Sequence, residues 1–209
     1  MRIKQEKLWS AYNMEKTENA VRSRLLEAGK EEFRDKGFLK ASLRSICRKA
    51  DVTTGALYFF FESKASLFEK IVEETVGSLE QIAGSLADPQ KEKIIQPEEY
   101  DRIVINFIWE NRDIARILIN GAEGTRYENF WEDTCKKMEQ LLQENFLKNY
   151  GKEADSDLVH VLAEMKLQGY TQLLNKDYSH EKFLKLSKML KICSDCGYQV
   201  IEEETARMQ

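Results

Sequence analysis

Two residue patterns in this sequence could hold a metal ion or support catalysis, and both are incomplete. Cys193 and Cys196 have the C-x-x-C spacing of a zinc site, which needs two more ligands. The sequence contains only two histidines and no second C-x-x-C. Asp157 and His160 match half of a di-iron bundle site, which requires a second such pair. No phosphate loop, nucleotide fingerprint or Ser-His-Asp order occurs. We therefore predict no metal, no cofactor, no catalytic residue and no enzyme.

A different chemistry is indicated by the segment from Ser42 to Phe61. Within this segment, a short helix begins at the small residues Thr53 to Ala56, which let the helix backbone approach DNA closely. Four aromatic residues follow from Tyr58 to Phe61. They cannot all face one core on a helix, so at least one is expected at the surface, able to contact a sugar, a phosphate or a thymine methyl group. Two short helices joined by a tight turn predict a helix-turn-helix, whose second helix enters the major groove.

Three helices must position this segment. A helix from Glu18 is expected to stop at Gly37, which suits the left-handed position after a helix C-terminus. Ser42 is a predicted N-cap for a helix to about residue 49, Thr53 for a helix to about residue 60, and Ser63 for a long fourth helix. The predicted scaffold residues of this module are Leu43, Ile46, Leu57 and Phe61.

The remainder of the chain also has helical periodicity. The residues 88–98 hold both prolines and several charges and are the clearest linker. Beyond them we expect helices at about 97–110, 113–119, 127–150, 156–174 and 179–204. The expected fold class is all-α. The expected organisation is an N-terminal arm (1–17), a helix-turn-helix domain (18–75) and a C-terminal helical domain (76–209).

The distribution of charge is compatible with a nucleic-acid partner, although the net charge is −4. Residues 1–75 carry 15 Lys and Arg against 12 Asp and Glu, whereas the rest carries 17 against 24. A small basic module on an acidic body can bind DNA because only the docking face meets phosphate. The sequence has neither a signal-peptide pattern nor an apolar run long enough for a membrane helix. We therefore expect a cytoplasmic protein without a membrane partner.

The segment from Val52 to Leu67 (VTTGALYFFFESKASL) resembles the signature of the TetR family of repressors. The upstream stretches LEAGKEEF (26–33), Gly37-Phe38 and SLRSI (42–46) match the first two helices of that family in order and spacing. The resemblance is close over residues 18–75 and loose beyond. Phe60 replaces a frequent histidine, so it is left off the DNA contacts. The DNA-binding residues that the resemblance implies are Ser42, Arg44, Thr53, Thr54, Gly55, Ala56, Tyr58, Phe59 and Lys64.

The resemblance also implies a function. It predicts a ligand-responsive repressor that binds a pseudopalindromic double-stranded operator as a homodimer, with a helical C-terminal bundle for dimerisation and for a small-molecule inducer. Wide apolar stripes on helices 156–174 and 179–204 suit a four-helix dimer interface, and the fourth helix is the expected lever between the two domains. The aromatic and Met content suggests a mainly apolar ligand. The candidate pocket residues, which plain core packing would also explain, are Phe107, Trp109, Ile117, Phe130, Trp131, Met138, His160, Met165 and Tyr170.

Two alternative functions remain open from the sequence. One is a helical enzyme with a metal-dependent or other activity. The other is a structural or partner-binding helical protein that has lost DNA binding. Metal analysis would separate the first from a repressor, and a salt-dependent DNA-binding assay would separate the second.

Overall fold

The structure is a computed structural model that describes residues 2–86 and 97–208, and these residues form helices and no strands. The predicted all-α class is thus confirmed for the described chain. Most of the predicted linker, residues 88–96, lies outside the described residues. The helices are α1 (Arg2–Lys40), α2 (Leu43–Ala50), α3 (Thr54–Phe60), α4 (Lys64–Leu86), α5 (Pro97–Glu110), α6 (Arg112–Asn120), α7 (Phe130–Tyr150), α8 (Ser156–Leu174) and α9 (His180–Met208).

Most predicted helix boundaries agree with the structure, and three differ. Helix α1 already begins at Arg2, so the predicted arm and the first helix are one element. Helix α7 begins three residues later than predicted because Thr125 forms a turn, in which its hydroxyl donates to the Ala122 carbonyl and accepts from the Tyr127 N–H. Helix α9 continues to Met208. These differences lie at helix ends, where sequence patterns constrain least.

Local capping residues explain where the helices of the N-terminal head, α1 to α3, begin and end. Gly37 adopts φ +70° and kinks α1, as predicted for a left-handed glycine. The Ser42 hydroxyl accepts from the Ser45 N–H at 3.4 Å, and the Thr53 hydroxyl accepts from the Ala56 N–H at 3.1 Å. Asp51 ends α2 in the left-handed conformation. The predicted N-caps Ser42 and Thr53 are therefore confirmed.

The start of α4 is capped by two serines that bond each other's backbone. The Ser63 hydroxyl accepts from the Ser66 N–H, and the Ser66 hydroxyl contacts the Ser63 N–H, both at 3.1 Å. This is the reciprocal arrangement of a capping box, with serine in place of the usual glutamate. The predicted role of Ser63 is confirmed.

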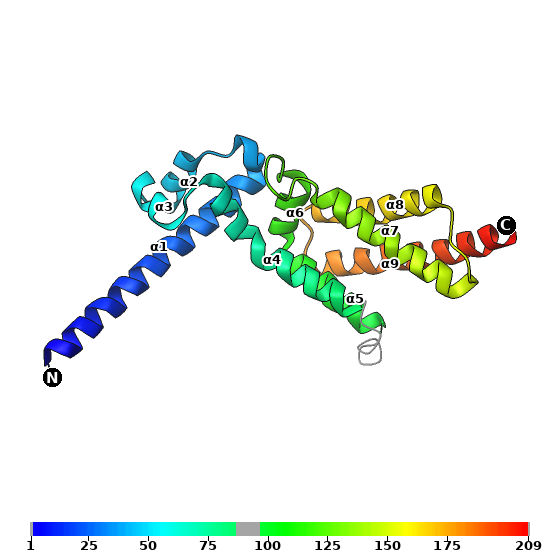
Figure 1. Cartoon of the computed structure of the whole chain (residues 1–209), viewed down its shortest axis with the longest axis horizontal. Helices are drawn as coiled ribbons and strands as arrows, with labels where there is room; N and C mark the ends of the chain where they lie inside the picture. Colours follow the sequence, from blue (N-terminus) through cyan, green and yellow to red (C-terminus); the bar gives the residue numbers. More distant parts are fainter. Residues whose placement is uncertain (1, 87–96, 209) are drawn as a thin grey trace.

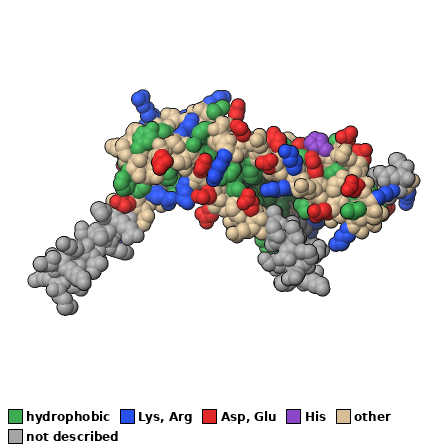
Figure 2. All heavy atoms as spheres, viewed as in Figure 1, with side chains coloured by type: hydrophobic (Ala, Val, Ile, Leu, Met, Phe, Trp, Pro, Cys, Tyr) green, Lys and Arg blue, Asp and Glu red, His purple; other side chains and the backbone are tan. Residues whose placement is uncertain are grey.

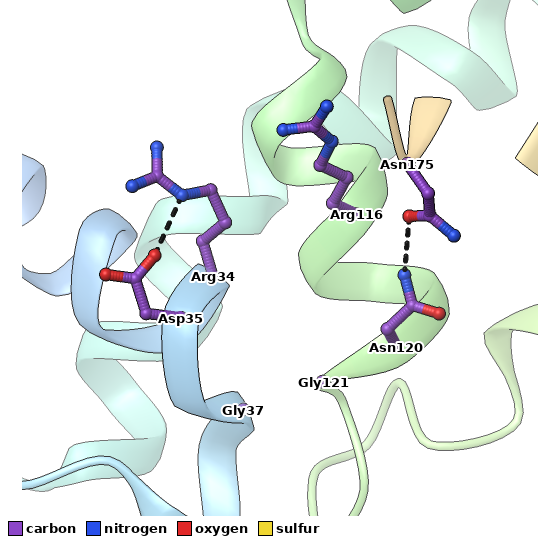
Figure 3. A pocket seen from close by; sticks show the side chains of 7 residues that line it. All are labelled: Arg34, Asp35, Gly37, Arg116, Asn120, Gly121 and Asn175. Carbon is purple, nitrogen blue, oxygen red and sulfur yellow. Dashed lines mark hydrogen bonds and ion pairs between the residues drawn. The ribbon is translucent and has the colours of Figure 1, made fainter. Parts of the chain in front are cut away.

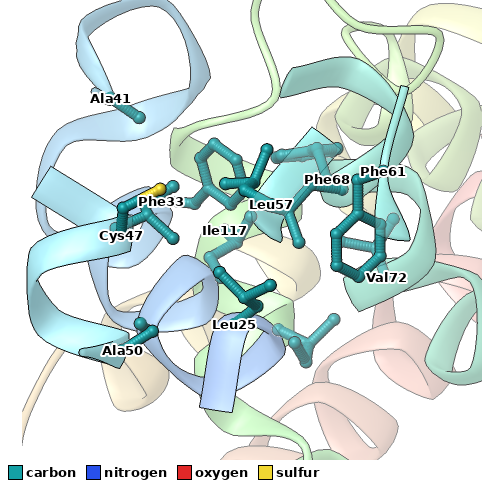
Figure 4. Close-up of a cluster of buried hydrophobic side chains, with 14 of the residues drawn as sticks. Leu25, Phe33, Ala41, Cys47, Ala50, Leu57, Phe61, Phe68, Val72 and Ile117 are labelled. Atoms are coloured by element: carbon teal, nitrogen blue, oxygen red, sulfur yellow. The ribbon is translucent and has the colours of Figure 1, made fainter. Parts of the chain in front are cut away.

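One hydrophobic core joins the head to the rest of the chain, α4 to α9, which we call the body (Figure 4). Phe33 of α1 and Phe68 of α4 are fully buried and meet edge to face at 5.1 Å. Helix α6 packs against both helices and adds Ile117, which is 1% exposed. Figure 1 accordingly shows α6 between the head and the remaining helices. The core therefore includes α6, outside the predicted helix-turn-helix domain.

A second, smaller core lies between α7 and α8. Its buried members include Cys135 and Leu142 of α7 and Leu162 and Ala163 of α8, and Ile201 of α9 packs against them. The two cores are linked through α6, which contacts α1, α4, α7 and α8.

Within the described residues, no helix is both long and apolar enough to cross a membrane.

Candidate nucleic-acid interface

Helix α3 presents its first turn to solvent and its opposite side to the core. Thr53, Thr54 and Gly55 are exposed, and Ala56 is half-buried. Leu57 is completely buried and Phe61 nearly so. The predicted division of this segment into scaffold and surface residues is therefore confirmed for these positions. A helix anchored in this way offers a first turn of small side chains to a groove.

The four consecutive aromatic residues divide between surface and core. Phe59 is 71% exposed and Tyr58 is 54% exposed. The ring of Phe60 meets the ring of Phe59 edge to face at 4.9 Å and is partly buried against the core. The expectation that at least one aromatic side chain reaches the surface is confirmed. Large exposed aromatic side chains beside a small-residue turn indicate a contact surface, since water solvates them poorly.

Helix α2 adds polar and cationic groups to the same end of the molecule. Ser42 and Arg44 are exposed at its first turn, and Arg48 is exposed at its last. Figure 2 shows Lys and Arg side chains together with hydrophobic ones at the surface of the end that carries α2 and α3. Arg48 was not among the predicted contacts, although its charge is available to phosphate.

A buried carboxylate that sequence reasoning missed fixes α2 against α1. Glu32 is 1% exposed and accepts from Lys36 at 2.7 Å, from the Ser45 hydroxyl at 2.9 Å and from the Ser42 N–H at 3.3 Å. Lys49 of α2 lies 3.4 Å away. A carboxylate at a helix N-terminus satisfies free N–H groups and the helix dipole. The signal for it was a charged residue in register with the buried Ala28.

The environment of Glu32 strongly favours its ionised form. Burial by itself would raise the pKa of Glu32. The hydrogen bonds from Lys36, Ser45 and the Ser42 backbone outweigh that effect and lower the pKa to about 2. The position of the helix-turn-helix on α1 therefore depends on a charged carboxylate inside the head.

The structure gives Lys64 hydrogen-bond partners inside the chain. Its ammonium donates to the carbonyls of Phe38, Leu39 and Ala41 at 2.7, 3.2 and 3.2 Å and lies 4.6 Å from the Phe38 ring centre. An ammonium has three N–H donors, so all are used inside the chain. The end of α1 leaves carbonyls without helical partners at this point. Lys64 thus binds the α1–α2 connection.

The head meets the body at a close backbone contact between two glycines. The Phe38 N–H donates to the Gly121 carbonyl at 2.8 Å. A Cβ on Gly121 would lie 3.0 Å from the Gly37 Cα and 3.2 Å from the Ile117 carbonyl oxygen. Arg34 of α1 also reaches Asp113 of α6 at 3.4 Å. The C-terminal end of α6 and the end of α1 are therefore in direct backbone contact.

A polar cavity of about 280 Å³ opens beside this glycine contact (Figure 3). Arg116 of α6 donates across it to the Leu174 carbonyl at the end of α8 and to Asp177. Asn120 and Asn175 are joined by a hydrogen bond of 3.3 Å. The cavity lining therefore connects the ends of α1, α6 and α8 through polar groups.

The structure does not bring the predicted pocket residues to one place. Ile117 and Phe130 belong to the core shared by head and body, and Trp109 stacks on His180 at 5.2 Å. Met165 is 65% exposed. The others are spread over the chain: Phe107 lines a cavity of about 410 Å³ between α1, α4, α5 and α6, Tyr170 is half-buried on α8, and Trp131, Met138 and His160 lie where α7 meets α8. Aromatic and Met content alone therefore did not locate a pocket.

Helices α8 and α9 leave large apolar side chains in solvent. On α8, Val161 is 51% and Met165 is 65% exposed. On α9, Met189, Ile192 and Val200 are 53%, 47% and 60% exposed. Exposed apolar side chains clustered on neighbouring helices are typical of a surface that another protein covers.

The N-terminal part of the chain is similar in sequence to known proteins. Residues 25–71 match the family of bacterial regulatory proteins described as the tetR family. The chain is 37% identical over 60 residues to the HTH-type transcriptional regulator UidR of Escherichia coli, and 38% identical over 56 residues to the A-factor receptor protein of Streptomyces griseus. These alignments cover 29% and 27% of this chain, and only 31% and 20% of those relatives.

The fold of a solved structure covers more of the chain. A transcriptional regulator from Aquifex aeolicus superposes with a TM-score of 0.56 over 82% of this chain and 98% of its own, at 23% identity. The likeness in fold therefore covers more of the chain than the two alignments above, which cover 29% and 27% of it.

Proposed function

We propose that this chain, a TetR-family transcriptional regulator by its N-terminal domain, is a repressor that binds a pseudopalindromic operator as a homodimer through residues 42–61. The observation that carries the proposal is the exposed first turn of α3 beside the exposed Tyr58 and Phe59. In this proposal, α3 enters the major groove while α2 crosses the phosphate backbone. Regulation of transcription, and not catalysis, is the role.

The proposed DNA contacts are the predicted set without Lys64. Ser42 and Arg44 meet phosphate at the start of α2. The turn from Thr53 to Ala56 approaches base edges, because its small side chains permit close contact. Tyr58 and Phe59 contact sugar, phosphate or thymine methyl groups. Glu32 and Lys64 act behind this surface by fixing α2 and the end of α1.

The proposed homodimer forms through α8 and α9. The exposed Val161 and Met165 of one copy and Met189, Ile192 and Val200 are the apolar groups it would cover. A two-fold axis would place two copies of α3 on half-sites about one turn of DNA apart. Pairing also compensates for the weak basicity of a single head, since two linked heads bind with a high effective concentration.

We further propose that a small molecule controls the spacing of the two heads. The name of one relative, the A-factor receptor protein, describes a receptor. Helix α6 could couple a bound ligand to the head, because α6 packs on α1 and α4 and Gly121 at its end contacts the backbone of Gly37. We therefore propose that α4 and α6 together, and not α4 alone, couple the C-terminal domain to the head. An inducer needs only to bind the arrangement that disfavours DNA more tightly.

The test is binding of the purified chain to DNA taken from upstream of its own gene, followed by fluorescence anisotropy over a series of salt concentrations. The affinity should fall linearly in a plot of log K against log salt. Thr54→Glu should weaken binding at least about tenfold, because it places a carboxylate against the DNA. Gln140→Glu adds the same charge at an exposed position on α7 and should leave binding unchanged.

The proposal fails if no DNA in that region is preferred over unrelated DNA at any salt concentration. It also fails if Thr54→Glu and Gln140→Glu bind equally well. Calorimetry with apolar and cationic compounds tests the inducer separately, since a true inducer must change operator affinity.

A further inference from the structure

A cluster of metal-binding side chains lies between α7 and α8, away from the candidate DNA interface. Cys135 and Glu139 are four residues apart on α7, and His160 and Glu164 are four residues apart on α8. Residues at this spacing share one helix face. The ligand atoms of Cys135, Glu139 and His160 all lie within 4.8 Å of one another. The two helices pack on each other through the second core, so the cluster is held by the fold.

The side chains of the cluster contact one another directly. Nδ1 of His160 lies 2.7 Å from Oε1 of Glu139, and Sγ of Cys135 lies 3.5 Å from the same oxygen. The thiol is 3% exposed, whereas the His160 side chain is 59% exposed. The sulfur is thus at the base of the cluster, and the imidazole at its solvent side leaves a route for an ion to enter.

The base of the cluster is electronegative. Glu139 and, one helical turn from His160 on α8, Glu164 are the two carboxylates beside this cluster. Glu164 is itself held by a hydrogen bond of 3.2 Å from the Trp131 indole N–H. Glu139 is paired with His160, so a bound ion would take the place of the imidazole proton as the partner of this carboxylate. An ordinary surface ion pair between Glu139 and His160 would not require the thiol or Glu164.

We propose that Cys135, Glu139 and His160 form a binding site for a thiophilic divalent cation of the zinc class. A thiolate, an imidazole and a carboxylate are the donors that Zn²⁺ prefers. Calcium and magnesium are disfavoured because they take oxygen ligands. Three protein ligands leave the fourth tetrahedral position to water. On binding, the sulfur–hydrogen bond breaks, the proton passes to solvent and the sulfur electron pair coordinates the ion.

Such an ion would join α7 to α8 beside the exposed apolar face of α8. Sequence reasoning predicted no metal site because it looked for ligands in one motif. Here two ligands come from α7 and one from α8, and Cys135 and His160 are 25 residues apart in the sequence. Only the antiparallel packing of two helices brings them together. The proposal does not depend on DNA binding, and its measurement requires no DNA.

The test is titration of the chelator-treated protein with Co²⁺, whose thiolate charge-transfer and d–d absorption reports a tetrahedral site with sulfur. We expect one ion per chain, displacement by Zn²⁺, and quenching or shift of tryptophan fluorescence because Trp131 adjoins the site. Cys135→Ser should abolish the charge-transfer band. His160→Gln should weaken binding at least about tenfold. Loss of a residue that only positions a metal ligand already costs about that much, and His160 is proposed as a ligand itself.

The chain offers matched controls for both variants. Cys193 is an exposed free cysteine on α9, and His180 contacts Asn106 and Trp109, away from the cluster. Cys193→Ser and His180→Gln should leave the Co²⁺ spectrum and affinity unchanged. The proposal is overturned if the wild-type protein shows no thiolate band. It is also overturned if the band survives Cys135→Ser or disappears in Cys193→Ser, with circular dichroism showing that each variant is folded.

Discussion

The head and the C-terminal helices treat their polar and apolar groups in opposite ways. In the head, Glu32 forms several hydrogen bonds inside the chain, and so does Lys64 at the adjoining start of α4. On α8 and α9, Met165 and Val200 are apolar groups left in water. The buried charges of the first region are therefore satisfied inside the chain, whereas α8 and α9 leave aliphatic and thioether groups exposed.

This difference indicates two kinds of partner. The exposed groups of the head are aromatic rings beside hydroxyls and arginine, which suit the mixed chemistry of a nucleic acid. The exposed groups of α8 and α9 are aliphatic or thioether chains, which suit a second protein surface. The following variants test whether the two regions are independent in this way.

The largest effect is expected from charges placed on the proposed dimer face. The double variant Met165→Glu and Met189→Glu should convert a dimer to a monomer, because burying two carboxylates in each copy is strongly unfavourable. Operator affinity should then fall roughly 10²- to 10⁴-fold through loss of paired binding. Sedimentation and anisotropy measure both. Gln140→Glu serves as the control, and a variant that stays dimeric would contradict the assignment of this face.

Removal of the buried carboxylate should destabilise the head. Because the folded pKa of Glu32 is about 2 against an ordinary value of 4.5, its contribution is complete above pH 4.5 and is lost as pH falls towards 2. Glu32→Gln should therefore lower the free energy of unfolding at pH 7 by about 3 kcal/mol. Urea unfolding at a series of pH values checks this.

The same variant should flatten the dependence of stability on pH between 4.5 and 2. Glu31→Gln is the neighbouring control, since Glu31 is 46% exposed and contacts only Lys49 at 3.5 Å. Its effect should stay below about 1 kcal/mol. Equal effects of the two variants would show that the buried network has no special role.

Lys64 and Arg44 distinguish an internal clamp from a phosphate contact. Lys64→Met should lower stability by about 1.5–3 kcal/mol, because carbonyls of the α1–α2 connection lose a charged donor. It should leave the slope of log K against log salt unchanged. Arg44→Ala should do the reverse, with stability unchanged and the slope reduced by about 1. A reduced slope for Lys64→Met would instead show that Lys64 contacts DNA phosphate.

The smallest effect is expected at the glycine contact between head and body. Gly121→Ala should destabilise the protein by roughly 1–3 kcal/mol, since its Cβ would meet backbone atoms of Gly37 and Ile117 that cannot easily move. Gly77→Ala in α4 meets nothing within 4 Å and should instead stabilise by roughly 0.4–1 kcal/mol. Thermal unfolding separates the two, and a stable Gly121→Ala would show that head and body are only loosely joined.

Residues close together in the sequence were assigned well. The N-caps Ser42 and Thr53, the left-handed Gly37, and the division between buried Leu57 and exposed Phe59 all follow from helix geometry within a few residues. Helical period and capping chemistry act locally, so the order and type of the elements can be inferred from one chain.

Contacts between residues distant in the sequence cannot be predicted in this way. Residue type does not show that packing distributes the candidate pocket residues over separate cores. Nor does it show that Lys64 binds the carbonyls of Phe38 and Ala41, more than twenty positions away.

By itself, therefore, the sequence determined an all-helical chain with a helix-turn-helix near its start. The tertiary structure decided which charges are internal, which apolar faces stay exposed, and that Cys135 meets His160. The physical reason is that burial and charge pairing depend on which helix faces pack together, and that packing is not encoded in the spacing within any one helix.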